Sequence, residues 1–195
     1  TTGAYNTFIG ESAGSSNTTG GQNTFVGMKV GESNTTGGDN INIGMYAGRY
    51  NTTGTRNIAI GNNALDGPDT EDDNLAIGYD ALGGAIAGGE YNVAIGNYSL
   101  DANTSGYKNI AVGYDALTAN TEGNRNTAVG HGSLIANTTG EYNNAFGLAT
   151  LYSNTTGGSN IAIGNGALLS NTTASYNTAV GFQSLRDANR TADAN

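Results

Sequence analysis

The chain has no cysteine or tryptophan, only one proline, and few basic or bulky apolar side chains. Without Cys, disulfides, thiolate metal sites and cysteine nucleophiles are excluded. Only seven Lys and Arg stand against sixteen Asp and Glu, and the formal net charge is −9. We therefore expect no nucleic-acid partner and no anionic membrane partner, since both need a basic surface. No apolar run approaches the roughly 20 residues of a membrane helix, so we expect no membrane insertion.

Bulky apolar residues are too scarce for an ordinary globular core. Leu, Ile, Val and Phe together number 33 of 195 residues, whereas Gly, Asn and Thr number 85. This composition lies near that of disordered chains, because so few apolar side chains offset little of the chain entropy lost on folding. A conventional enzyme domain is therefore not expected.

An internal repeat accounts for the unusual composition. The motif N-x-[A/F/N]-[I/V/F]-G occurs eleven times, and every step is 17 residues except the 18-residue step from Asn74 to Asn92. Such a fixed period is the signature of a solenoid. We expect the motif Asn residues to stack into a structural ladder along its length. They are Asn6, Asn23, Asn40, Asn57, Asn74, Asn92, Asn109, Asn126, Asn143, Asn160 and Asn177.

A second block, usually N-T-T-G, follows eleven residues after the motif Asn and predicts a turn, with Asn bonding to its own backbone and Gly at positive φ. Many of these Asn residues also match the N-x-[S/T] glycosylation sequon. A turn explains Asn and Gly without any sugar, but the recurring Thr pair leaves glycan attachment to Asn or Thr as a second hypothesis. The candidate sites are Asn17, Asn34, Asn51, Asn103, Asn137, Asn154 and Asn171, and Asn97 and Asn189 match the sequon elsewhere.

Each repeat predicts two short extended pieces separated by the motif Gly, with no stretch long enough for a helix. The first piece, such as 109–113, is β-branched at alternate positions, whereas the second, such as 114–117, is too weak to stand alone. The fold expected for residues 1–195 is therefore all-β: a single parallel β-solenoid, or β-roll, of eleven 17-residue coils. The motif Gly indicates a bend or a backbone conformation that other residues resist.

Three columns of the repeat predict the interior. The residue three after the motif Asn is always Ile, Val or Phe, which predicts a continuous buried ladder. The residue two after it is Phe8, Phe25 and Asn42 in the first three repeats and Ala in the other eight. The residue eight after it is Gly in the same three repeats and Leu in the others. In both cases a large residue in one column accompanies a small residue in the other. We therefore expect these two columns to pack against each other in one cavity.

Such a thin core favours burial against further chains. Successive residues of a strand point to opposite faces, so one set can line the coil while the other meets a neighbouring subunit. We therefore expect the chain to associate with itself, as a homotrimer or as a head-to-tail filament.

The N-x-A-[IV]-G-x-x-[AS]-L unit resembles the head repeats of trimeric autotransporter adhesins, the YadA-like heads, and similar repeats occur in phage tail fibres. The resemblance covers essentially the whole chain. It implies a left-handed parallel β-roll, three chains side by side, and projection from a cell or virion to bind a surface. The 17-residue period is longer than that of the YadA-like head repeat, and the N-T-T-G loop is an addition to it.

Little in the sequence indicates catalysis, a cofactor or a metal. The single histidine, His131, lies in a variable column, and no nucleophile, base and acid arrangement can be assembled from the Ser and Thr residues. Hard oxygen ligands for calcium are concentrated in one acidic loop, although its spacing matches no EF-hand, and a solvated loop is the better interpretation. The acidic residues are Asp66, Asp69, Glu71, Asp72 and Asp73. The sequence therefore assigns no catalytic, cofactor or metal residues.

The regular rod is interrupted at residues 66–91, where Pro68 replaces the loop Asn and the next coil carries the extra residue. A specific contact with a partner is to be sought there first. Tyr residues concentrate beside the motif, and we interpret them as strand residues covering a sheet edge, with stacking on sugars as the alternative. Surface glycans and a host receptor are the partners expected besides self.

The leading functional hypothesis is a non-enzymatic structural or adhesive segment of an extracellular fibre, located at a cell or virion surface. Partial repeats at both termini, including Thr1-Thr2-Gly3, predict that the array continues past both ends. The alternative is an ice-binding β-roll, because plant ice-binding proteins resemble this chain in their N-x-V-x-G repeats. Against that alternative, Thr lies in the turns and the strand position after Asn is irregular, as at Thr7 and Ile41.

Overall fold

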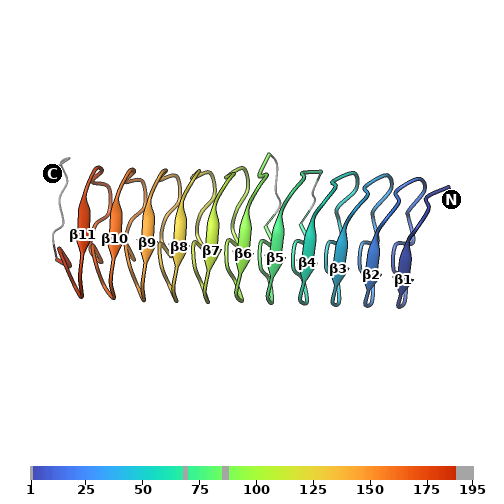
Figure 1. Ribbon diagram of the computed structural model, residues 1–195, viewed down its shortest axis with the longest axis horizontal. Helices are drawn as coiled ribbons and strands as arrows, with labels where there is room; N and C mark the ends of the chain where they lie inside the picture. Colours follow the sequence, from blue (N-terminus) through green and yellow to red (C-terminus); the bar gives the residue numbers. More distant parts are fainter. Residues whose placement is uncertain (1, 68–69, 85–87, 188–195) are drawn as a thin grey trace.

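The computed structural model describes residues 2–67, 70–84 and 88–187, and within these ranges it contains strands and turns but no helix (Figure 1). Each repeat contributes one three-residue strand. The strands are β1 (Thr7–Ile9), β2 (Thr24–Val26), β3 (Ile41–Ile43), β4 (Ile58–Ile60), β5 (Leu75–Ile77), β6 (Val93–Ile95), β7 (Ile110–Val112), β8 (Thr127–Val129), β9 (Asn144–Phe146), β10 (Ile161–Ile163) and β11 (Thr178–Val180). All eleven follow the motif Asn directly.

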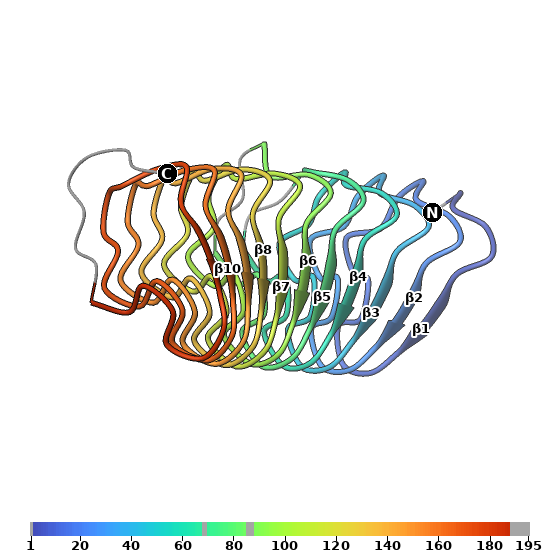
Figure 2. The same cartoon turned by 60° about the vertical axis from the view of Figure 1, so that its left-hand side comes forward.

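The strands form one parallel sheet in sequence order, β1 to β11. Equivalent residues of successive repeats pair with each other, as Thr7 does with Thr24. The extra residue of the irregular coil does not disturb this register, because Leu75 still pairs with Val93. Figure 2 shows the strands in a row along one wall of a stack of coils, from β1 at one end to β10 near the other. The predicted all-β parallel β-solenoid is confirmed.

The interior is lined by the middle residue of each strand and by the column eight residues after the motif Asn. The Ala residues of the first column are 0–3% exposed, and Leu65 to Leu168 of the second are 0–1% exposed. In the early repeats, a Cβ added at Gly14 would lie 2.7 Å from the ring of Phe8. The rings of Phe8 and Phe25 stack with centroids 5.0 Å apart. The predicted exchange of large and small residues across one cavity is confirmed.

The prediction of a buried ladder three residues after the motif Asn is wrong. In this column Ile9 is 59% exposed, Ile163 is 42% exposed and Val180 is 66% exposed. Since side chains alternate along a strand, this column and the buried column two after the Asn must point to opposite faces. In most coils the cavity is so narrow that the sheet wall can place only Ala in it, and the branched residues therefore lie outside.

The prediction of a second extended piece is also wrong. Residues 114–117 form turns, and Asp115 and Leu117 have φ of 56° and 53°. The buried Leu of most other repeats likewise has φ near 50°. Residues other than Gly adopt this left-handed region at a cost of about 1–2 kcal/mol each. The burial of the Leu side chain therefore outweighs the local backbone preference here.

Two kinds of Gly serve different purposes. The motif Gly residues have φ between 123° and 145°, as the predicted bend requires. The loop Gly residues do not have the positive φ predicted for N-T-T-G. They are required for space, because a Cβ at Gly123 would lie 2.5 Å from the carbonyl oxygen of Gly140 in the next coil.

The boundary between the two interior arrangements provides a stability test. Asn42 is 1% exposed, and neither polar atom of its side chain has a hydrogen-bond partner among the described residues. A Cβ at Gly48 would overlap that side chain. We expect Gly48→Leu alone to lower the free energy of unfolding. The double variant Asn42→Ala/Gly48→Leu should have a free energy of unfolding about 2 kcal/mol or more above that of the wild type, because a buried Leu then replaces an unpaired amide.

Urea unfolding of the wild type, both single variants and the double variant measures this coupling. If the effects of the two substitutions simply add, the two columns do not share one cavity.

Candidate functional surfaces

The motif Asn residues form a hydrogen-bonded ladder through the solenoid. At each of ten steps the backbone N–H of one Asn donates to Oδ1 of the previous Asn, with N–O distances of 2.9–3.0 Å. The side-chain nitrogen donates across the coil, as from Asn109 Nδ2 to the Gly123 carbonyl at 2.8 Å. Asn74 lacks such a partner among the described residues, because its coil is the 18-residue one. The ladder is therefore structural and presents no group to a ligand.

The loop Asn residues proposed for glycosylation are also buried. Asn17, Asn34, Asn51, Asn103, Asn137, Asn154 and Asn171 are 0–3% exposed. Their Nδ2 atoms donate within the loop or to the preceding loop Asn, as Asn137 does to Gly140 and Asn120. A sugar on Nδ2 would have to displace these bonds and leave the interior. Glycosylation stays a prediction, but the folded coil offers no room for it at these Asn residues, and Asn189 lies outside the described residues.

The loop Thr pair has one bound and one free position. The first Thr commonly donates its hydroxyl to the next loop, as Thr35 Oγ1 does to the Thr52 carbonyl at 2.9 Å. The second Thr, such as Thr139 or Thr156, is exposed. Exposed hydroxyls therefore form a single line along the rod, and O-linked modification would be located there.

Two carboxylates of the acidic loop pair with an arginine of the preceding coil. Arg56 Nε contacts Asp73 Oδ1 at 2.7 Å, and Arg56 Nη2 contacts Asp72 Oδ2 at 3.2 Å. The hydrogen bond to Arg56 lowers the pKa of the Asp73 carboxyl. Asp69 lies outside the described residues, and the described part of the chain contains no group of three His, Cys, Asp or Glu residues suited to a metal ion.

A second acidic cluster, of which the sequence analysis named only Asp66, lies beside the irregular coil. Burial and then the neighbouring Asp80 raise the pKa of Asp66 to about 6. Burial, Asp80 and Asp115 also raise the pKa of Asp101. These four residues occupy two columns, six and nine residues after the motif Asn, in four successive coils. Reading down those columns could have found them.

The outward face of the sheet is apolar and uncharged. It consists of the first and third residues of every strand, and none of these 22 positions holds Asp, Glu, Lys or Arg. Elsewhere the same chain carries 23 charged residues. Eight Ile, Val and Phe of this face count among the most exposed large apolar side chains.

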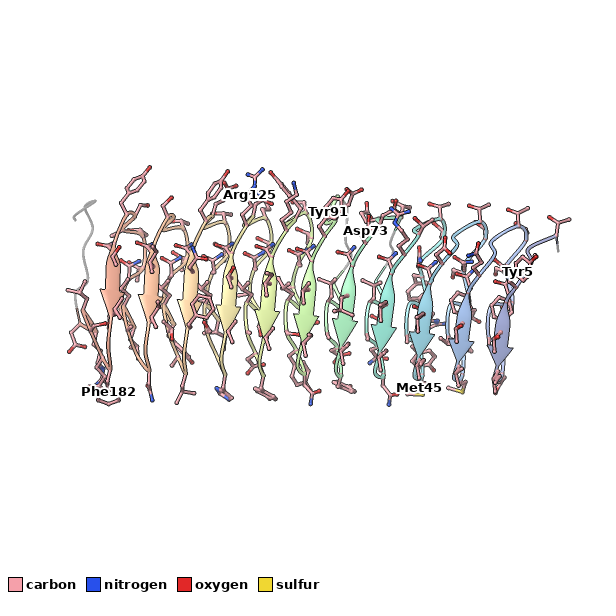
Figure 3. All side chains as sticks on the ribbon, viewed as in Figure 1. Tyr5, Met45, Asp73, Tyr91, Arg125 and Phe182 are labelled. Carbon is pink, nitrogen blue, oxygen red and sulfur yellow. The ribbon has the colours of Figure 1, made fainter. Side chains whose placement is uncertain are left out.

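The Tyr residues do not lie in the strands, contrary to the prediction, and several of them flank the sheet at its two margins. At one margin Tyr79, Tyr98 and Tyr114 form edge-to-face pairs with centroids 5.5 and 5.8 Å apart. His131 stacks on Tyr114 at 5.3 Å and is exposed. At the other margin, labelled by Tyr91 and Arg125 in Figure 3, Tyr residues alternate with cations.

No helix in the described part of the chain is long and apolar enough to cross a membrane. Comparison with family models, with curated proteins and with solved structures found no match. The resemblance to YadA-like heads and tail fibres, and the handedness and trimer it implies, therefore stay predictions.

The ladder predicts an unequal response to two Asn→Ala substitutions. Asn109→Ala removes the acceptor of the Asn126 backbone N–H and one of the two donors to the Gly123 carbonyl, which keeps its bond from Asn120 Nδ2. An unpaired buried group costs about 1–3 kcal/mol and a lost hydrogen bond about 1 kcal/mol, so we expect a loss of about 2–4 kcal/mol in unfolding free energy. Asn165→Ala, at an exposed position, should change it by less than about 0.5 kcal/mol. Equal effects in urea unfolding would contradict a structural role of the ladder.

The acidic cluster predicts a pH dependence of stability. Because the folded-state pKa of Asp66 is raised to about 6, protonation stabilises the fold, and this contribution is lost as the pH rises through 6. The full shift corresponds to about 3 kcal/mol, which solvent screening of the half-buried carboxyl reduces to about 1 kcal/mol. Asp66→Asn should therefore raise the melting temperature at pH 7.5 more than at pH 4.

Asp39→Asn is the control, since Asp39 is exposed and lies outside the cluster. It should shift the melting temperature equally at both pH values. If the melting temperatures of both variants changed with pH in the same way, Asp66 would not be the source of the pH dependence.

Proposed function

We propose that the chain is a non-enzymatic structural rod, a segment of an extracellular fibre whose copies associate side by side as a homotrimer through the outward sheet face. The single observation that carries the proposal is the composition of that face. An uncharged parallel sheet that runs along the whole rod, in a chain of net charge −9, is unusual on a free surface.

The dimensions of the face give the size of the interface that it can form. Eleven strands about 4.8 Å apart span about 50 Å, and three residues of strand add a width of about 10 Å. The resulting area is about 500 Å² before side-chain relief is counted, which is below the roughly 800 Å² that each partner contributes to an interface of standard size. Ile and Val side chains in register with their neighbours would then be removed from water.

The interior gives a physical reason for association. Each coil buries little more than an Ala and a Leu or Phe together with hydrogen-bonded Asn. Most of the branched apolar residues face outward, where they contribute to stability only if another surface covers them.

A surface location and an adhesive role rest on the resemblance to adhesin heads and tail fibres. They are consistent with a rod that stacks coils along one axis and places loops and margins in solvent (Figure 2). Surface glycans or a host receptor are the partners we propose for such a role, besides further copies of the chain.

Ice binding is less well supported. A flat array of Thr is needed to match an ice lattice, whereas the loop hydroxyls exposed here form one line, and only Thr7, Thr24, Thr127 and Thr178 lie on the sheet. Thermal hysteresis of a dilute solution would favour this alternative instead.

Light scattering coupled to size exclusion tests the assembly. We expect about 59 kDa for the wild type, three times the chain mass of 19.7 kDa. Ile43→Asp/Ile163→Asp places carboxylates on the sheet face, at positions 39% and 42% exposed, and should shift the assembly toward monomer. Burying unpaired carboxylates in an interface is strongly unfavourable.

Ile135→Asp is the matched control, because Ile135 lies outside the strands and is only half-buried. It should leave the mass unchanged. A stable monodisperse wild-type monomer would refute the proposal.

A further inference from the structure

A ridge of tyrosines and cations runs along the margin of the rod at which the strands begin (Figure 3). We call it the tyrosine–cation ridge and define it by Tyr91, Tyr107, Lys108, Arg125 and Tyr142. Tyr91, Lys108, Arg125 and Tyr142 immediately precede the motif Asn in four successive coils, and each has φ between 56° and 61°. Their side chains are exposed, Tyr91 by 51% and Tyr142 by 47%.

Within the ridge, rings and cations alternate. The Lys108 ammonium lies 5.7 Å from the ring centroid of Tyr91 and 5.6 Å from that of Tyr107. The Arg125 guanidinium lies 5.1 Å from Tyr107 and 5.2 Å from Tyr142. Arg125 also donates a hydrogen bond to the Tyr142 hydroxyl. Cation–π contacts and this bond hold the two cations in place along about 14 Å of the rod.

The charges of the two cations are not compensated as those of other arginines are. Arg49 pairs with Glu32, and Arg56 pairs with Asp72 and Asp73. Among the described residues, neither Lys108 nor Arg125 forms an ion pair. Both lie at the same position of adjacent coils, so their backbones are about 4.8 Å apart and their charges repel. One anionic group bound between them would relieve this repulsion.

The surroundings of the two cations limit what the anion can be. Two residues before the motif Asn, the same four coils hold Glu90, Tyr107, Asn124 and Glu141, so a carboxylate lies at each end of the ridge. Glu141 accepts a hydrogen bond from Asn124 Nδ2 at 2.8 Å. These carboxylates would repel a polyanion such as a nucleic acid, but they accept hydrogen bonds from hydroxyl groups.

We propose that the tyrosine–cation ridge binds a sugar acid, a glycan residue that carries one carboxylate. The carboxylate lies between Lys108 and Arg125, and the free N–H groups of the guanidinium donate to it. A sugar hydroxyl donates to Glu90 or to Glu141, which lie about 14 Å apart at the two ends of the ridge, and the Tyr rings cover the apolar side of the sugar. The site lies at a margin of the rod, so it stays accessible when the sheet face is covered.

The methyl glycoside of galacturonic acid, a sugar with a single carboxylate, is a suitable probe for an NMR titration. We expect a dissociation constant of about 1 mM and a saturable shift of the Arg125 Nε–Hε resonance. Arg125→Gln and Lys108→Gln should each weaken binding by about tenfold or more, since a charge-assisted hydrogen bond is lost. The backbone spectrum of both variants should otherwise match the wild type.

Lys29→Gln is the matched control, because Lys29 is a cation without an ion pair among the described residues and lies outside the ridge. It should bind the probe as the wild type does. Binding of the methyl ester of the same sugar with equal affinity would overturn the role of the carboxylate. Acetate producing the same shifts at the same concentration would overturn the role of the sugar, and no shift at Arg125 would overturn the site itself.

Discussion

A buried amide at the same place in every coil is the constraint on which the structure depends. The motif Asn accepts the backbone N–H of the next Asn and donates to a carbonyl across its own coil, as Asn109 does with Asn126 and Gly123. Both bonds require equivalent atoms at a fixed distance along the rod, so they set the repeat length and the register. Where the coil is one residue longer, the Asn74 side-chain nitrogen loses its partner among the described residues, while the strands stay in register.

This constraint also makes the coil narrow. A polar ladder and close backbone approach leave room for Ala from the sheet wall opposite Leu, or for Phe from the sheet wall opposite Gly. The Leu is held at positive φ to reach the cavity, and Gly is required where adjacent loops approach. The branched residues are consequently placed outside. The apolar sheet face and the need for a partner surface thus follow from the same interior that the Asn residues define.

The sequence predicted the coils, the strands and the volume exchange between Phe8 and Gly14, because these depend on periodicity and size. It failed where apolar character alone was used to choose a face: Ile163 is bulky and apolar, yet it is exposed because the adjacent Ala162 is the residue that fits inside. Left-handed φ at Leu117 could not be predicted, since local preference opposes it. Lys108 and Arg125 could be found in one column of the repeat. Their cation–π contacts with Tyr107, however, depend on the backbone conformation of the turn before each strand.

The rod thus differs from side to side: an interior of amides and small apolar residues, an uncharged sheet face, and margins that carry aromatic and charged residues. Hydrogen exchange of the backbone amides tests the central claim most directly. The account predicts that the N–H groups of the motif Asn residues from Asn40 to Asn160, which are bonded to Asn side chains inside the rod, exchange among the slowest in the chain. Exchange of these amides as fast as that of the exposed Asn165, whose N–H donates no hydrogen bond among the described residues, would contradict it.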